Sequence, residues 1–505
     1  MKYQLSFDTA RLLPSTPSFL YGYLGDSFGH RRKHISNIAL FMFFLTPGAS
    51  ATAGTQFPPG TFNLIEVHRL ALVQDARLNA ARHDYLAQNE SVAQARSGLL
   101  PTLSAGANIE SSSTKHDGAG SARKRSGVIF HATLNQPLVR LDRWYAFYAA
   151  SSGSREARLR LADKEQRLIL ESAEVYFNTL RAMDTRASAK AEALALERQK
   201  QQAEAQLDNG VANLADVLEA RAAHDNAIAN RQAAERAVQD AFEALGHLTG
   251  EAPSMIAGLA HQMPSQPPFP AQPAAWVEQA LQNNLALQAS EYAVNAAQQR
   301  HRERKAGHAP TLDATAAYRR GDNDRLGYGE LAQFGHSRSN GNVVQQSITL
   351  ELNIPLYAGG LTSSQVREAG HRLVQVEYDR DEQRRRVVED TRNFYRAVNT
   401  DIDQVQARFK NIVSSQASLK ANKRGRELGT RTFTDILNSE RQLYRTIRQY
   451  NDARYDYILN TLRLKQVSGN LSSEDILEIS RYLVRSIDPD KHFLPPAAAI
   501  HPSPS

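Results

Sequence analysis

The sequence predicts a membrane α+β protein built from two tandem structural repeats, in which β-hairpins are set between long helices. Three observations predict this fold class. Short motifs recur in the same order along the chain, two segments alternate apolar and polar residues, and the stretches around them carry sustained heptads. The chain has 505 residues, 22% of them charged, and a mean hydropathy of -0.49. These values exclude a bundle of transmembrane helices.

The two repeats are marked by pairs of matching motifs. The stretch "NGVANLADVL" that begins at Asn209 is matched by "LGTRTFTDIL" that begins at Leu428. "PTL" occurs at Pro101 and again at Pro310, and "LNQPL" is matched by "LNIPL". Matches in the same order over most of a chain indicate duplicated structural units. We therefore predict a first repeat at 62–250 and a second at 276–480, joined at 251–275 by a proline-rich linker that cannot form a continuous helix.

Both ends of the chain are predicted to lie outside the repeats. Residues 1–53 hold an N-terminal extension and a secretory signal peptide, in which basic residues precede the apolar run Ile35–Leu45 and small residues that end at Ala51 or Ala53. That run is too short to cross a bilayer as a helix. Residues 481–505 are predicted to be a disordered tail that contains prolines. Since the chain has no cysteine, we expect neither disulfides nor a lipid anchor on a cysteine.

Two hairpins are predicted, at 101–138 and at 310–356. In each, every second residue is apolar, and a polar loop separates the two alternating stretches; the loop of the second hairpin, at 319–342, is longer. Alternation gives a strand one apolar and one polar face, which fits either a half-buried soluble sheet or a lipid-facing transmembrane strand. The membrane interpretation is favoured because the flanking sequence is helical and offers these strands no other partners.

Long helices are predicted on both sides of the hairpins. In the first repeat, Leu161 and Ala173 each begin a series of apolar residues spaced by seven, and Val388 and Thr391 begin similar series in the second. Sustained heptads indicate long helices that pack side by side as coiled coils. A helix over 151–207 would be about 85 Å long. No compact globular core accommodates such a length.

Four strands cannot close a barrel by themselves. An open strand edge in hydrocarbon would leave backbone groups without hydrogen-bond partners. If the hairpins lie in a membrane, several chains must therefore combine into one barrel. Their helices would then continue the barrel as a tube of coiled coils.

In these motifs the sequence resembles the TolC family of outer-membrane efflux and secretion channels. The resemblance covers residues 62–480 and is most specific in "LGTRTFTDIL" and in "ARYDYILNTLRLKQVSG", which runs from Ala453 to Gly469. It implies a homotrimer whose twelve-stranded outer-membrane β-barrel takes four strands from each chain and is continued by a long periplasmic α-helical barrel. It also implies a passive exit duct of the cell outer membrane for type I protein secretion or drug efflux, with no cofactor and no catalytic activity.

The resemblance further implies the partners of this duct. They would be a periplasmic membrane-fusion (adaptor) protein and an inner-membrane ABC or RND transporter that supplies the energy. Outer-membrane lipid would surround the barrel. No nucleic acid is expected, because the net charge of +7 comes from interleaved acidic and basic residues on helices.

The resemblance also implies where the duct is gated. The two copies of the repeated motif would lie at the periplasmic tips of the helical hairpins, with Gly210 and Gly429 in the turns. The gate and constriction would be formed by Asp435, Asn438, Arg431, Asp216, Ala215 and Arg426. Asp435 would form a ring of three carboxylates that attracts cations and in which like charges raise one another's pKa. Arg431 would help to hold the closed state, with Asp216 as a partner.

Three gate positions depart from the family pattern. Asn438 replaces a second acidic residue, Ala215 replaces a hydroxyl-bearing residue, and Arg426 replaces a tyrosine. We therefore expect a weaker cation ring and a closed state with fewer polar links, which opens more readily. The alternative interpretation of the repeated motif is structural, with glycines that end helices and aspartates that are solvated near helix N-termini.

Other classes of function find less support in the sequence. It contains no GxSxG, Walker A or HExxH motif. His301 and His308 lie on a predicted helix without acidic or sulfur ligands at metal-binding spacing, so we expect no metal. The remaining alternative is a soluble periplasmic coiled-coil scaffold or adaptor protein with small hairpins at its tip, which the heptads alone would permit.

Overall fold

The structure is a computed structural model that describes residues 61–114, 123–210, 213–251, 253, 255–322, 342–484, 488, 490, 493 and 495. The extension and signal peptide predicted at 1–53 lie outside these residues. So does most of the loop predicted at 319–342, of which residues 319–322 and 342 belong to strands.

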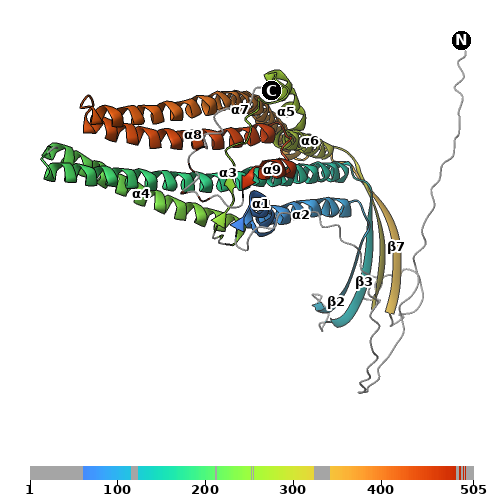
Figure 1. Ribbon diagram of the computed structural model, residues 1–505. Coiled ribbons are helices and arrows are strands. Elements are labelled where there is room, and N and C mark those ends of the chain that lie inside the picture. Colours follow the sequence, from blue (N-terminus) through green and yellow to red (C-terminus); the bar gives the residue numbers. More distant parts are fainter. Residues whose placement is uncertain are drawn as a thin grey trace, which may run out of the picture. The chain divides into compact units, whose positions relative to one another are not determined.

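Two series of elements follow each other along the chain in matching order (Figure 1). The first consists of β1 (Thr61–Phe62), α1 (Leu64–Gln74), α2 (Ala76–Ser97), β2 (Thr102–Thr114), β3 (Arg123–Val139), α3 (Leu141–Asp208) and α4 (Leu214–Thr249). The second consists of β4 (Met255–Ile256), β5 (Gly258–Leu259), α5 (Pro273–Asn283), α6 (Leu285–Ala306), β6 (Thr311–Asp322), β7 (Asn342–Asn353), α7 (Leu361–Glu427), α8 (Phe433–Val467), α9 (Ser473–Ser480) and β8 (Leu483–Val484).

Corresponding helices of the two series have nearly equal lengths. Helices α1 and α5 have 11 residues each, and α2 and α6 have 22 each. The long helices α3 and α7 have 68 and 67 residues, and α4 and α8 have 36 and 35. Equivalent capping residues set some of these boundaries. The side chain of Asp75 caps α2 by accepting from the N–H of Leu78, and Asn284 caps α6 by accepting from Leu287. The helices therefore form a structural duplication.

The two hairpins form one antiparallel sheet with strand order β2-β3-β6-β7. Its register places apolar residues opposite each other on one face: Leu103 pairs with Leu134, and Ala316 with Ile348. This face is unprotected within the chain, since Leu103 is 75% exposed and Ile348 is 85% exposed. Within the described residues, β2 and β7 each have one unpaired edge. Burial of this face and of both edges therefore requires other molecules.

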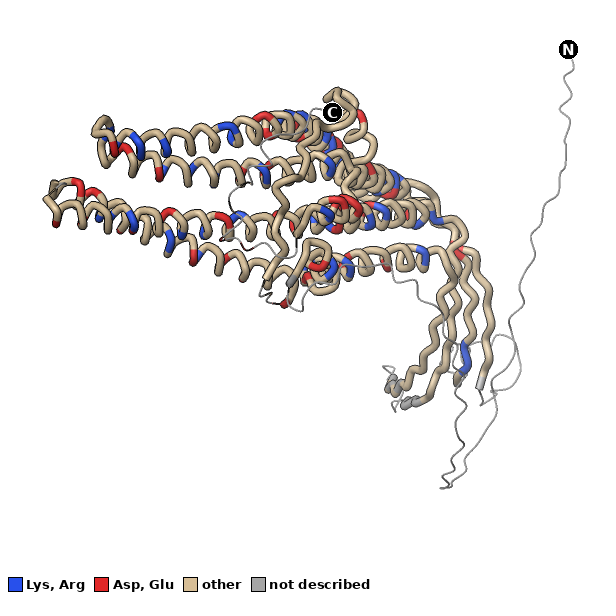
Figure 2. The backbone as a smooth tube through the Cα atoms, in the orientation of Figure 1, with Lys and Arg blue, Asp and Glu red and all other residues tan. Residues whose placement is uncertain are grey.

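The helices carry most of the charge. Figure 2 shows acidic and basic residues interspersed along them, whereas the described strands are mostly uncharged. No helix within the described residues is both long enough and apolar enough to cross a membrane. Helix α3 begins at Leu141, earlier than the predicted start at Ser151, because the aromatic stretch after Arg140 contains no helix breaker.

The helices pack as a layer in the order α2-α3-α6-α7, and the hairpins α3–α4 and α7–α8 extend to the side away from the strands (Figure 1). Half of the predicted heptad residues are buried between helices, such as Leu196 and Val398, and nearly all the others are half-buried. Leu194 is the counterexample, with 48% of its surface exposed, because a straight helix drifts relative to a seven-residue repeat. The largest core cluster lies where α1, α3, α8 and α9 meet, around the fully buried Tyr176 and Phe177.

The predicted disordered tail is ordered at several positions. Strand β8 pairs with β5, and the buried ring of Phe493 stacks on Tyr444 of α8. The Nζ of Lys190 lies 2.5 Å from the carboxylate of Asp490. The prediction of disorder from residue 481 is therefore wrong for these residues, because they bury an aromatic side chain and add backbone hydrogen bonds.

A polar seam joins the two hairpins where α3 packs on α8. Three ion pairs cross it at 2.5–3.0 Å: Glu174–Arg463, Arg181–Asp456 and Glu192–Arg448. Between them the Tyr455 hydroxyl donates to the Asp184 carboxylate at 2.7 Å. Burial against α8 raises the pKa of Asp184 to about 6, although the Tyr455 hydrogen bond and the charge of Arg454 oppose this shift.

The raised pKa of Asp184 predicts a pH dependence of stability. The folded state binds the proton more tightly than the unfolded state, whose carboxyl has the ordinary pKa of 3.8, so this residue makes the protein less stable as pH rises from about 4 to about 6. We expect Asp184→Asn to raise the free energy of unfolding at pH 7 by about 1–2 kcal/mol, a value reduced for residual solvent exposure. Thermal unfolding at pH 5 and pH 7 measures this. An equal pH response of the variant and the wild type would contradict it.

Candidate functional site at the helical tips

The repeated motif forms the turn at the tip of each helical hairpin. Gly210 follows α3 with φ 69°, and Gly429 follows α7 with φ 72°. Such values favour glycine, and an added Cβ would meet no atom within 4 Å at either position. The backbone conformation alone therefore requires glycine here.

The two aspartates of the motif occupy equivalent places after these turns. Each is the third residue of its helix, and its N–H donates to a capping side chain: Asp216 to Asn213 at 2.8 Å and Asp435 to Thr432 at 3.2 Å. The Asp435 carboxylate also accepts from the Thr432 N–H at 2.9 Å, which completes a capping box. The recurrence of the motif thus has a structural basis in helix termination and capping.

The cap determines the charge state of Asp435 in the single chain. The hydrogen bond from the Thr432 backbone N–H lowers the pKa of this carboxyl, and the Thr432 side chain and the charge of Arg431 lower it further against a small effect of desolvation. Repulsion within a ring of three carboxylates would act in the opposite direction. Asn438 lies exposed one turn further along α8.

Arg426 connects the two hairpin tips. Its Nη2 lies 3.2 Å from the Oδ2 of Asp216, and its guanidinium lies over the Phe433 ring at 5.9 Å. The side chains of Arg426 and Asp216 are 31% and 20% exposed, so the ion pair is partly shielded from solvent. The expectation that replacement of the tyrosine by Arg426 removes a link is therefore wrong for this contact, because the guanidinium reaches Asp216 directly.

Arg431 and Ala215 make no such connection. Arg431 has no ion pair with any described residue, and its side chain lies against Gly425, where an added Cβ would be 2.6 Å from the Arg431 Cγ. Ala215 is exposed and has no polar side-chain atom. Of the two arginines, Arg426 is therefore the one that pairs with Asp216 within the chain.

Three further polar contacts at the tips were not predicted. The Thr434 hydroxyl donates to Glu219 between the two hairpins, Lys423 pairs with Glu440 at 3.0 Å, and Asn422 donates to Ser439 at 2.5 Å. Glu219 lies three residues after Asp216 and so on the same face of α4, which was the available signal in the sequence.

Apolar packing supports these contacts. Phe433 and Leu437 of α8 are buried against Val217 and Ala220 of α4, together with Leu196 of α3. The two hairpins of one chain are therefore held together at their tips by a small core under a partly exposed polar layer. In the portions of the chain that are described, no group of three or more His, Cys, Asp or Glu side chains could hold a metal ion.

Comparison with known proteins identifies the family. The model of a family described as "Outer membrane efflux protein" matches residues 67–251 and 276–470, which are two segments of similar length. The chain belongs to the outer membrane efflux protein family. It is an exit duct of the outer membrane for secretion or efflux, and it extends into the periplasm.

Individual relatives of this outer membrane efflux protein match it over most of their length. It is 29% identical to "Outer membrane protein TolC" of Escherichia coli, over 84% of this chain and 86% of the relative. It is 30% identical to TolC of Vibrio cholerae, over 83% and 93%. It is 26% identical to "Alkaline protease secretion protein AprF" of Pseudomonas aeruginosa, over 82% and 85%.

Solved structures show the same fold. CusC superposes with a TM-score of 0.70 at 16% identity, over 80% of this chain and 92% of that one. The outer membrane protein VceC from Vibrio cholerae also has a TM-score of 0.70 at 16% identity, over 80% and 96%. The four-stranded sheet and the long helices of the outer membrane efflux protein therefore form a known channel architecture.

Proposed function

We propose that three copies of this outer membrane efflux protein form a passive duct that is gated at the helical tips. The observation that carries this proposal is the contact between the tips within one chain, where Arg426 pairs with Asp216 beside the contact of Thr434 with Glu219. Both contacts are near solvent and join the hairpin tips, which otherwise meet through a small core. They can therefore be broken without unfolding the long helices.

The open edges of the sheet support the trimer. Three copies of a four-stranded sheet pair every edge and leave the apolar face toward lipid. Native mass spectrometry of the detergent-solubilised protein tests this assembly: a trimer is expected, and a water-soluble monomer would contradict it.

The energy for transport would come from other proteins. We propose that a periplasmic membrane-fusion protein contacts the duct and connects it to an inner-membrane ABC or RND transporter. The duct itself would use no cofactor and catalyse no reaction. Relatives that include a protease secretion protein and an efflux protein support both kinds of cargo. Co-purification of the duct with a cross-linked adaptor from intact cells tests the partnership.

The Asp435 ring makes a separate prediction about ions. In a trimer, three Asp435 carboxylates would attract cations at the tip, and Asn438 one turn further adds no charge. We expect Asp435→Asn to shift the reversal potential in a salt gradient toward the non-selective value, and Asn438→Asp to shift it in the cation-selective direction. Single-channel recording in planar bilayers measures both. Unchanged selectivity in both variants would exclude the ring.

A further inference from the structure

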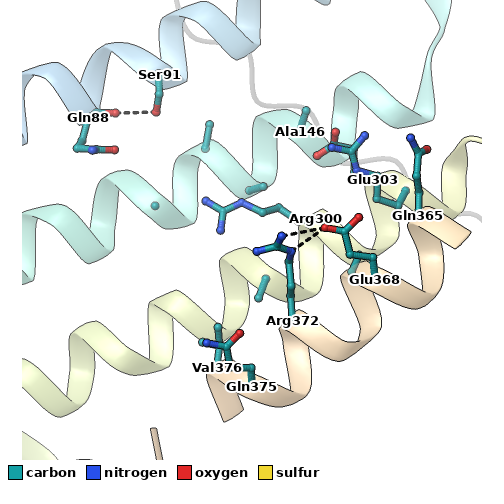
Figure 3. Close-up of a pocket in the computed structure, with 16 residues that line it drawn as sticks. Gln88, Ser91, Ala146, Arg300, Glu303, Gln365, Glu368, Arg372, Gln375 and Val376 are labelled. Carbon is teal, nitrogen blue, oxygen red and sulfur yellow. Dashed lines mark hydrogen bonds and ion pairs between the residues drawn. The ribbon is translucent and has the colours of Figure 1, made fainter. Parts of the chain in front are cut away.

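The helical layer next to the sheet has two chemically different faces. On one face, α2, α3, α6 and α7 all line a cavity of about 690 Å³, which includes Ala149 and Gly153 of α3 and Arg300 and Arg304 of α6 (Figure 3). Because these four neighbouring helices line one cavity, we take this face as the concave side of the layer. Figure 3 also shows the ion pair between Arg372 and Glu368 in its wall, at 2.9 Å.

A second, smaller cavity lies on the opposite face. It has a volume of about 350 Å³ and is lined only by the two middle helices of the layer. Its lining consists of five residues of α3 and two of α6: Tyr145, Tyr148, Ser151, Ser152 and Arg155, and Gln299 and Arg302. These positions alternate along both helices with those of the first cavity, so this groove opens on the convex side. Because α2 and α7 form the edges of the layer, contacts between chains would leave it accessible.

The lining of this outer groove, as defined by these seven residues, is basic and hydrogen-bonding. It contains two arginines and no carboxylate. Arg155 lies over the Tyr292 ring at 5.9 Å, and neither Arg155 nor Arg302 has a carboxylate partner within the described residues. The neighbouring Glu156 is paired with Arg160 at 2.5 Å. Guanidinium groups with free donors beside hydroxyl groups favour a phosphate.

The position of the groove indicates which kind of molecule would carry that phosphate group. Helix α3 begins at the end of the apolar strand β3, and its first turns expose Trp144 (45%) and Tyr148 (48%), whose rings are 6.3 Å apart. Exposed aromatic side chains at this level are typical of a membrane interface. Arg302 lies about 6 Å before the end of α6, which leads into β6. Arg155 lies further from the membrane, about 21 Å along α3 from Leu141, with its guanidinium over the Tyr292 ring. Its long side chain must turn toward Arg302 for both guanidinium groups to reach one phosphate.

We propose that the outer groove binds the phosphate of an anionic phospholipid from the periplasmic leaflet of the outer membrane. Arg155 and Arg302 hold the phosphate, the two serines donate further hydrogen bonds, and the tyrosines lie beside the glycerol and upper acyl region. The proposal rests on the outer-membrane location and is independent of gating at the tips. Each trimer would hold three such lipids between barrel and helices.

A matched pair of variants tests this proposal. Arg155→Gln with Arg302→Gln removes two arginines from the outer groove, whereas Arg300→Gln with Arg304→Gln removes two from the concave face. Each trimer is reconstituted in nanodiscs of phosphatidylglycerol and phosphatidylethanolamine, and retained lipids are counted by native mass spectrometry. We expect the first variant to bind phosphatidylglycerol about ten-fold or more weakly, and the second to bind it like wild type. Equal retention by both would overturn the proposal.

Two further measurements sharpen the test. The first distinguishes a lipid from free phosphate, and the second distinguishes the paired hydrogen-bond donors of arginine from positive charge alone. Phosphatidylglycerol should raise the unfolding temperature of the wild-type trimer, and inorganic phosphate should not; an equal rise with inorganic phosphate would overturn the lipid assignment. If the glutamine variant does not assemble, Arg155→Lys with Arg302→Lys replaces it. Lysine retains the charge but loses the paired donors of arginine, so a reduced preference for phosphatidylglycerol is expected. An unchanged preference would count against the site.

Discussion

Replacement of Gly469 by alanine is expected to abolish most of the assembled protein. Gly469 follows α8 with φ 76°, and a Cβ there would lie 2.3 Å from the carbonyl oxygen and 2.5 Å from the carbonyl carbon of Asn283. Both atoms belong to the backbone at the end of α5, so no side-chain rotation can relieve the overlap. Separation of α5 from α8, added to the cost of positive φ, should destabilise the fold by about 3–5 kcal/mol.

Gly250 is the matched control, because it ends α4 as Gly469 follows α8. Its φ is 73°, but an added Cβ would meet only side-chain atoms of Gln74, the nearest at 3.3 Å. We expect Gly250→Ala to cost about 1 kcal/mol, mainly for the backbone conformation. Thermal unfolding and trimer yield from membranes measure both variants. A similar loss in the two would show that the contact with Asn283 is unimportant.

The sequence could predict those parts of the fold that depend on local pattern. Alternation from Leu103 onward predicts strands, heptads from Leu161 onward predict long helices, and the repeated motif predicts their duplication. It could not predict the start of α3, since the aromatic residues after Arg140 have neither a heptad nor an alternating pattern. It also could not predict that Phe493 is buried and ordered, because this burial depends on a groove formed by distant segments of the chain.

The tip site was predictable to a similar extent. Gly210 and Gly429 can be identified from the motif because the turn itself requires them. The partner of Asp216 could not be identified, because the pairing depends on how two hairpins far apart in the sequence are placed side by side. From the sequence alone, an arginine in place of a tyrosine at position 426 suggests that a polar link between the hairpin tips is lost. In the structure, Arg426 extends to Asp216 and makes an ion pair.

Removal of this ion pair is expected to increase the open population of the duct. An exposed or partly exposed pair is worth about 0.5–1 kcal/mol. Three copies in a trimer that opens as a unit would contribute about 1.5–3 kcal/mol, so Arg426→Gln or Asp216→Asn should raise the ratio of open to closed channels by about 10- to 100-fold. Single-channel open probability in planar bilayers measures this ratio. The double variant should gain little beyond either single variant, because both remove the same contact.

Arg431→Gln decides between the two arginines. The family resemblance assigns the closing role to Arg431, whereas the structure places Arg426 on Asp216 and leaves Arg431 against Gly425. If the contact within the chain holds the closed state, Arg426→Gln opens the duct and Arg431→Gln has a much smaller effect. If Arg431→Gln opens it and Arg426→Gln does not, closure depends on contacts that Arg431 makes only between chains. The exchange of the two charges, Arg426→Asp with Asp216→Arg, provides the remaining check. It retains the attraction between positions 426 and 216, so it should restore closure only if these two residues face each other in the closed duct.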